Sequence, residues 1–226
     1  MAQNVTVKRG DTLLSIAAEH GFYDWKYVWD QNSALQEKRP DPNVLAPGDV
    51  VTVPDIRPKE ASGATNQVHK FRAKKPIAMV DIVLRNEYGY KYSDTRFELR
   101  VGEDEVYTGN SDPNGRVCVG VSPTTREADL TIWPFKDDDE FSFKWRLSIG
   151  GLNPILDKEG HATGDATGIQ ARLNNLGFVV GSESDSSNDK TKSPLADFQR
   201  FIGQESPTGE MDDETRSLLE SLHNSL

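Results

Sequence analysis

The hydrophobic pattern of residues 1–56 predicts a small βααβ unit. Apolar side chains in residues 13–18 recur at the spacing of one helical face, and residues 25–29 repeat this with two tryptophans and a valine. A short strand before Gly10 and a β-branched strand over residues 50–53 complete the order. The predicted boundaries are the helix caps Asp11 and Asp24, the turn residues Gly21, Asn32, Pro47 and Gly48, and a loop over residues 33–46.

Residues 77–149 change to a period of two. Residues 96–101 alternate with three apolar side chains on one face, as a half-buried strand does. About seven such short strands, separated by dense turn clusters, predict a small antiparallel β-sandwich. Cys118 lies in one of these strands, and we expect it to be buried as a small hydrophobic side chain.

Residues 166–226 return to helical periodicity. The first predicted helix covers residues 168–178, and the second covers residues 193–203, with Ser193 as its cap and Pro194 at its first position. A third, over residues 212–223, has acidic side chains in its first turn, where the helix dipole favours them. Gly177 is the predicted stop of the first helix. The expected core side chains of the second helix are Leu195, Phe198 and Phe201.

The overall prediction is a multidomain α+β chain with two linkers. The stretches between the periodic regions are rich in Pro, Ser, Gly, Thr and Asn and poor in apolar residues, as linkers are. The predicted order is a βααβ domain over residues 1–56, a linker over 57–76, a β-sandwich over 77–151, a linker over 152–165 and a three-helix domain over 166–226.

Charge and hydropathy narrow the classes of partner. The net charge is −10, and residues 1–56, 57–164 and 165–226 carry −3, −1 and −6. An acidic chain repels phosphate backbones, so nucleic acid is not expected as a partner. No apolar run approaches the ~20 residues that span a bilayer, so membrane insertion is not expected either. Residues 1–4 do not begin a basic region followed by an apolar one, so no classical signal peptide is expected.

The βααβ region resembles the lysin motif (LysM) family. The residues that carry the resemblance are Val7, Gly10, Asp11, Thr12, Leu13, Ile16, Ala17, Gly21, Asn32, Leu45, Pro47, Gly48, Asp49, Val53 and Pro54. LysM domains generally bind glycans that contain N-acetylglucosamine, such as peptidoglycan or chitin. The resemblance therefore implies a groove between two loops, with Asp11, Thr12 and Leu13 on one and Asn43, Val44 and Leu45 on the other. The alternative is that Asp11 and Thr12 only cap a helix and that Leu13 and Leu45 only fill the core.

Two further resemblances lie in the rest of the chain. Residues 107–117 resemble a turn of Ig-like, carboxypeptidase-regulatory-type sandwiches, which are usually spacers or docking platforms. Residues 166–225 resemble the three-helix peptidoglycan-binding domain found beside many cell-wall hydrolases. Such domains usually carry a glycine-punctuated loop where this chain has the serine- and aspartate-rich residues 181–192. The polar candidates for a second glycan site are Gln199 and Asp212. The other residues that carry this second resemblance are Ile169, Gln170, Arg172, Leu173, Leu176, Gly177, Leu195, Phe198, Thr208, Gly209, Met211, Thr215, Leu218 and Leu219.

No catalytic motif stands out along the chain. The four histidines lack metal-ligand spacing, Cys118 has no histidine near it in sequence, and there is no G-x-S-x-G elbow. A wall hydrolase would need a pair of acids clustered in a cleft, which a sequence cannot exclude. Since no unassigned segment is long enough for a hydrolase domain, we expect a non-enzyme without cofactor or metal.

Two wall-binding resemblances on one chain predict multivalent, non-catalytic binding to peptidoglycan. The arrangement is also similar to proteins encoded with bacterial type VI secretion and related contractile injection systems, where LysM modules occur in tail and spike components. The alternative is therefore a structural adaptor or cargo carrier whose domains dock spike or tail proteins rather than glycan. The expected location is the bacterial cytoplasm before delivery or assembly, with action at the periplasm or cell wall.

Overall fold

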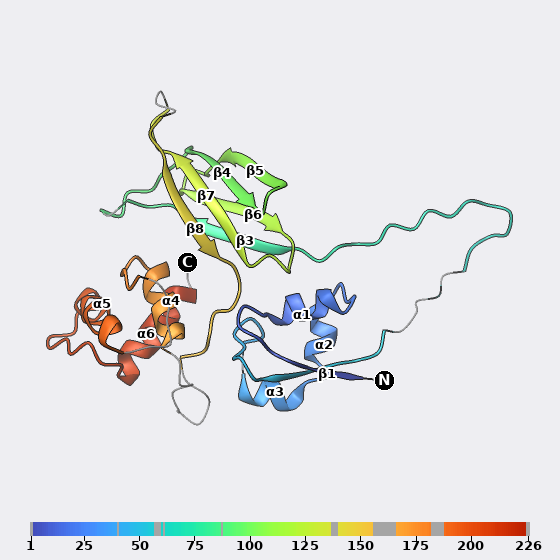
Figure 1. Ribbon diagram of the computed structural model, residues 1–226, viewed down its shortest axis with the longest axis horizontal. Coiled ribbons are helices and arrows are strands. Elements are labelled where there is room, and N and C mark those ends of the chain that lie inside the picture. The colour runs from blue at the N-terminus through green and yellow to red at the C-terminus, as the bar shows by residue number, and fades with distance from the viewer. Residues whose placement is uncertain are drawn as a thin grey trace. The chain divides into compact units, whose positions relative to one another are not determined.

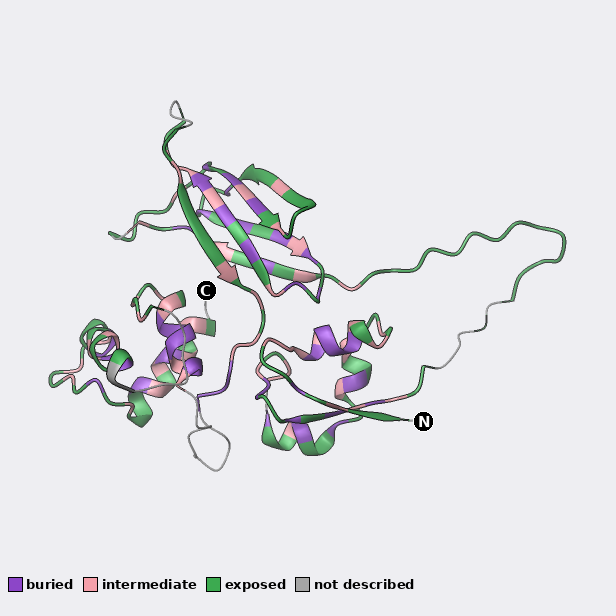
Figure 2. Cartoon of the chain, in the orientation of Figure 1, coloured by how far each residue is buried: buried purple, intermediate pink, exposed green. Residues whose placement is uncertain are grey.

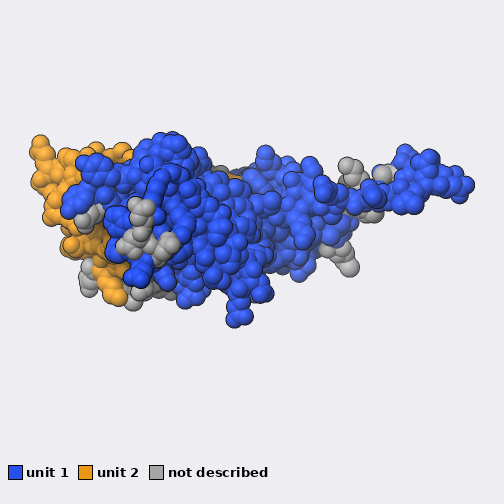
Figure 3. Space-filling view, turned by 90° about the horizontal axis from the view of Figure 1, so that it is seen from above, with its two compact units in different colours: residues 1–37, 47–151 blue, residues 38–46, 152–226 orange. Residues whose placement is uncertain are grey.

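The computed structural model contains both helices and antiparallel sheets, which confirms the α+β class (Figure 1). Its contacts form two compact units, the first of residues 1–37 and 47–151 and the second of residues 38–46 and 152–226 (Figure 3). The finer domain boundaries of the sequence analysis stay a prediction. No helix in the described part of the chain is long and apolar enough to cross a bilayer. The structure describes residues 2–39, 41–56, 60, 62–86, 88–136, 140–155, 166–181 and 188–224.

The N-terminal region of the first unit is a two-stranded sheet with short helices. Strands β1 (Gln3–Thr6) and β2 (Val50–Val53) pair antiparallel. Helices α1 (Leu13–Glu19), α2 (Trp25–Trp29) and α3 (Ser33–Lys38) follow β1 in the chain. The apolar faces predicted from periodicity are buried at their centres, shown in purple in Figure 2, while Trp25 and Trp29 are half-buried. The fully buried side chains include Leu13, Ile16, Ala17, Val28 and Val51.

The helix caps confirm one prediction and correct another. Asp24 caps α2 as predicted, since its Oδ1 accepts a hydrogen bond from the amide of Lys26 at 3.0 Å. The predicted cap of α1, Asp11, is wrong. Thr12 is the residue immediately before the helix, and it forms a reciprocal capping box with Ser15. Asp11 lies one residue too early and instead accepts a hydrogen bond from the amide of Lys8 at 2.8 Å.

Asn32 is a buried structural residue rather than a simple turn. Its Nδ2 donates to the carbonyls of Val28, at 2.7 Å, and Thr52, at 2.8 Å, and its Oδ1 accepts from the amide of Thr52 at 2.7 Å. The side chain thus pairs with β2 as a neighbouring strand would. Asn32 also accepts, through its carbonyl, the amide of Gln36, and the chain continues into α3 where residues 33–46 were predicted to be a loop.

The rest of the first unit contains two antiparallel sheets around one core. Strands β3 (Ala78–Val83) and β6 (Arg116–Val121) form the smaller sheet. The larger sheet has the order β5-β4-β7-β8, and its strands are β4 (Arg96–Val101), β5 (Glu105–Asn110), β7 (Glu127–Trp133) and β8 (Phe143–Ser148). Alternate residues of both sheets meet in the shared core, including Val80, Phe97, Leu99, Val117, Val119, Val121, Leu130 and Ile132.

The alternation of β6 corrects the prediction for Cys118. Val117, Val119 and Val121 point into the core, and the thiol between them is therefore on the outer face, where it is exposed. Residues 68–72 of the first predicted linker form no strand in the structure. Val68 and Phe71 in this segment are exposed.

The C-terminal part of the second unit is a three-helix arrangement of α4 (Thr167–Asn175), α5 (Asn188–Phe201) and α6 (Asp213–Asn224). Its core contains Leu195 and Phe198, as predicted, together with Ile155, Leu173 and Leu219. Gly177 ends the first helix region with a φ of +91°, which confirms the predicted stop. Residues 156–165 of the second predicted linker and 182–187 of the serine-rich loop lie outside the described residues.

Two predictions about α5 are wrong. The helix begins at Asn188 rather than at Ser193, so Pro194 lies inside it and not at its first position. The added turn carries buried Thr191, whose hydroxyl accepts a hydrogen bond from Nε2 of Gln170 in α4 at 3.2 Å. Phe201, expected in the core, is 68% exposed, although its ring contacts Phe178 and Phe198.

We predict that Asn32→Ala lowers the free energy of unfolding of the N-terminal region by about 1–3 kcal/mol, because it leaves the Thr52 backbone groups without their partner. Urea unfolding followed by tryptophan fluorescence would measure this. The exposed neighbour substitution Gln31→Ala is the control, and we expect a change within about 0.5 kcal/mol. Equal effects of the two substitutions would contradict the role of Asn32.

Candidate functional site

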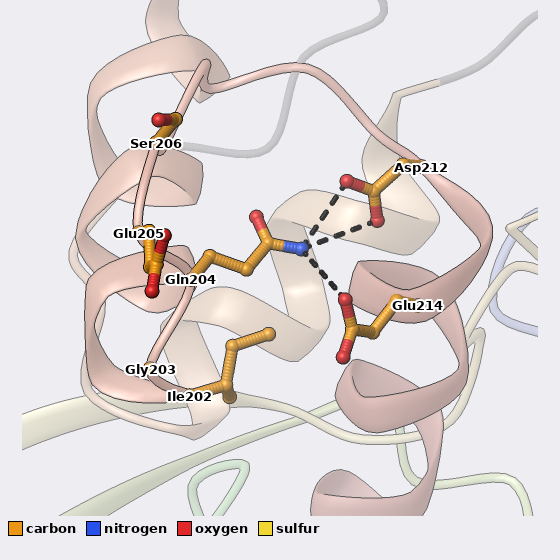
Figure 4. Close-up of a pocket in the computed structure, with 7 residues that line it drawn as sticks. All are labelled: Ile202, Gly203, Gln204, Glu205, Ser206, Asp212 and Glu214. Carbon is orange, nitrogen blue, oxygen red and sulfur yellow. Dashed lines mark hydrogen bonds between the residues drawn. The ribbon is translucent and has the colours of Figure 1, made fainter.

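A polar pocket lies where the chain passes from α5 to α6. Its volume is about 380 Å³. Most of the lining comes from the turn that follows α5, and the rest comes from the cap and first turn of α6 (Figure 4). The lining residues are Ile202, Gly203, Gln204, Glu205, Ser206, Asp212 and Glu214.

Gln199 holds the chain segment that frames this pocket. Its side chain is fully buried, and its Nε2 donates to the carbonyl of Glu210 at 2.8 Å and to the hydroxyl of Thr215 at 3.2 Å. Its Oε1 accepts from the amide of Gly209 at 2.7 Å. Gly209 has a φ of +70° and lies against the carbonyl of Lys192, so a larger side chain would collide there. The side chain of Gln199 therefore points into the domain. Its predicted role as a glycan contact stays a prediction.

Gln204 lies between two carboxylates inside the pocket. Its Nε2 is 3.2 Å from Oδ2 of Asp212, 3.5 Å from Oε2 of Glu214 and 3.1 Å from the hydroxyl of Thr215. Figure 4 shows its side chain pointing between the two acids. The pocket therefore presents mainly hydrogen-bond acceptors, because the donor group of Gln204 is already engaged by Asp212, Glu214 and Thr215. Such a surface suits a ligand rich in hydroxyl, amide or ammonium groups.

Asp212 is the helix cap of α6. Its Oδ1 accepts a hydrogen bond from the amide of Thr215 at 2.7 Å. The Thr215 hydroxyl, followed by the Thr215 backbone amide, lowers the pKa of the Asp212 carboxyl below its usual range. A general acid of a glycosidase needs the opposite, a raised pKa. Asp212 is therefore arranged to accept hydrogen bonds and is not poised to donate a proton.

The first predicted glycan loop is engaged within its own unit. Leu13 is fully buried, Thr12 caps α1, and Oδ1 of Asp11 forms an ion pair with Arg126 at 3.0 Å. The same guanidinium donates to the hydroxyl of Ser15 at 3.3 Å. Thr12 and Leu13 thus have the contacts of the structural alternative, whereas Asp11 pairs with Arg126 and does not cap the helix. Glycan binding by the three residues stays a prediction.

The second predicted glycan loop belongs to the other compact unit. Leu45 is buried, whereas Asn43 is exposed and donates its amide to Oδ1 of Asp41 at 2.8 Å. Val44 is partly exposed, and its amide bonds the carbonyl of Asp41 at 3.1 Å. The groove that the two loops would form together stays a prediction.

Sequence reasoning missed Gln204 and Arg126. Gln204 follows Gly203, a turn glycine with a φ of +88°, and this turn was the available signal for a loop that carries function. Arg126 carries no such signal, because its partner Asp11 is 115 positions away along the chain. Among the described residues, no group of three or more His, Cys, Asp or Glu side chains is placed to hold a metal ion.

Comparison with known proteins gives one match. Residues 164–219 match the model of a family described as "Putative peptidoglycan binding domain". The matched range contains every residue that lines the pocket. No curated protein and no solved structure matches the chain. The C-terminal helical region is therefore a peptidoglycan-binding-like domain, and the family it matches is a binding family rather than a catalytic one.

We predict that Asp212→Ala lowers the stability of the C-terminal helices by about 1 kcal/mol, through loss of the cap. Asp212→Asn, which keeps a cap oxygen, is the matched control and should stay close to the parent. Folding lowers the pKa of Asp212, so its charge stabilises the fold above the ordinary carboxyl pKa and is lost as pH falls through the lower folded value. Unfolding curves at neutral and acid pH would test this, and an equally acid-sensitive Asp212→Asn variant would contradict it.

Proposed function

We propose that the chain binds bacterial peptidoglycan without catalysing a reaction on it. The observation that carries this proposal is the coincidence of the family match over residues 164–219 with a polar pocket inside that range. Peptidoglycan offers hydroxyl and N-acetyl groups along its sugars, and amide and ammonium groups on its peptides. The acceptors of Asp212, Glu214 and Gln204 complement these donors. The proposed ligand class is a glycan that contains N-acetylglucosamine.

The N-terminal βααβ region is proposed as a second wall-binding module. Its support is the resemblance to LysM domains and the order of its elements, with β1 and β2 flanking the helices. Two weak sites on one chain gain effective concentration on a polymer if both engage together. The proposed setting is a type VI secretion or related contractile injection system, with the protein in the bacterial cytoplasm before delivery and acting at the periplasm or cell wall.

We predict that Ser206→Trp reduces saturable retention of the full chain on insoluble peptidoglycan sacculi at least about tenfold, because the indole fills the pocket, and tenfold corresponds to about 1.4 kcal/mol. Ser217→Trp is the matched control, since Ser217 is exposed on α6 and does not line the pocket. Sedimentation with sacculi would measure both variants. Equal loss, or no loss, in the two variants would reject the pocket as the binding site.

A second candidate function is a structural adaptor, in which the N-terminal region docks protein rather than glycan. The observation that favours it lies in the first unit. Arg126 forms an ion pair with Asp11. Gly150 and Gly151 pack so closely against Gly10 that a Cβ added to either would lie 3.0 Å or less from the Gly10 backbone. The loop proposed to meet glycan is therefore already in contact with the sheet region, as a docked structural module would be. The partners of such an adaptor would be spike or tail proteins.

The two candidate functions predict different retention on peptidoglycan sacculi once the pocket is blocked. For a two-module binder, we predict that Ser206→Trp keeps a weaker saturable retention, and that adding Asn43→Trp removes it by covering the second loop. Gln31→Trp added to Ser206→Trp is the control, because Gln31 is exposed outside both predicted glycan loops. If Ser206→Trp alone abolishes retention, the N-terminal region is not a glycan binder and the adaptor is favoured.

A further inference from the structure

Strand β8 forms an open edge of the larger sheet. In the order β5-β4-β7-β8, it pairs only with β7 among the described strands. Residues directly opposite each other on neighbouring strands share a face of the sheet. Phe143 is opposite Ile132 and Trp145 is opposite Leu130, and both of these β7 partners are buried in the core. The two β8 aromatic side chains therefore lie on the core face.

The smaller sheet leaves these aromatic side chains uncovered. Phe143 is 37% exposed and Trp145 is 42% exposed, and most of β8 is exposed in Figure 2. Phe135 and Phe141 continue the row, with successive ring centroids 5.3, 5.1 and 5.7 Å apart from Phe135 to Trp145. Successive rings are tilted by 53°, 83° and 39°, so this aromatic row is not a flat platform for a sugar. It suits branched apolar side chains.

The opposite face of β8 is basic. Lys144 and Arg146 alternate with the aromatic residues and are exposed. Arg146 pairs with Glu127 at 3.1 Å and with Asp129, its opposite residue on β7, at 3.9 Å. Lys144 is opposite the neutral Thr131 and is therefore the cation of this row with less charge compensation from β7. Strand β8 therefore carries aromatic side chains on one face of the sheet and basic side chains on the other.

These charges exclude a second copy of the chain as a good occupant. Two antiparallel registers pair five of the six β8 residues with both aromatic rows on one face, and they place Arg146 directly opposite either Lys144 or Arg146 of the other copy. Like charges directly opposite destabilise a strand pair, and edge lysines are a common protection against self-pairing. Protection alone would not leave a row of aromatic side chains exposed beside the edge.

We propose that the open edge of β8 binds an extended segment of a partner protein in which apolar and acidic residues alternate. The segment adds a strand to the sheet through backbone hydrogen bonds. Its apolar residues cover the aromatic row, and its carboxylates lie opposite Lys144 and Arg146. This site is separate from the pocket of the second unit and does not depend on peptidoglycan.

The test uses the full chain and two labelled peptides of equal length, one alternating valine with glutamate and one alternating valine with lysine. We expect the glutamate peptide to bind at least about tenfold more tightly in fluorescence anisotropy, a difference of about 1.4 kcal/mol. Hydrogen exchange should show protection of β8 amides when it binds. Lys144→Glu should reverse the preference, and Lys70→Glu, the same charge change in the exposed segment before β3, should not.

Three results would overturn the proposal. One is equal binding of the two peptides by the parent chain, which would remove the role of charge. Another is binding without protection of β8, which would place the peptide elsewhere. Protection of β8 that rises with protein concentration in the absence of peptide would show that a second copy occupies the edge instead.

Discussion

In each of the two compact units, one buried amide side chain forms hydrogen bonds with backbone groups of a region that has a proposed function. In the second unit, Gln199 satisfies backbone groups of Gly209 and Glu210, and this fixes the segment around the pocket. In the first unit, Asn32 does the same for both backbone groups of Thr52. An amide carries a donor and an acceptor, so it can replace the partner that a strand would supply.

This arrangement explains how short elements form ordered surfaces. Strands β1 and β2 have four residues each, and a two-stranded sheet of this length is marginal by itself. Asn32 adds hydrogen bonds along β2 at Thr52, and the helices bury the apolar side. In the C-terminal region, the capping of α6 by Asp212 uses a carboxylate that also lines the pocket. The same side chain thus caps the helix and lines the pocket proposed to bind peptidoglycan.

Periodicity predicted most elements, because the apolar faces of residues 13–18, 96–101 and 213–224 are set by local spacing. Periodicity failed where tertiary contacts determine the boundary of an element or the exposure of a side chain. The first turn of α5 contains Thr191, which is hydrogen bonded to Gln170 of α4, a contact that local spacing does not reveal. The exposure of Cys118 depends on which face of β6 meets the core. The candidate site was found in part, through Asp212. Gln204 could not be assigned, since its partners meet only after the turn at Gly203 has formed.

The ion pair between Arg126 and Asp11 has a consequence for the order of folding. It joins residues 115 positions apart, so the entropy of closing that long loop opposes it until other contacts have formed. The helices around Leu13 and the sheet around Leu130 are built from much more local contacts. We therefore expect the two regions to fold separately and the contact of Arg126 with Asp11 to form last. During synthesis, the N-terminal region would be complete well before Arg126, which immediately precedes β7, has emerged.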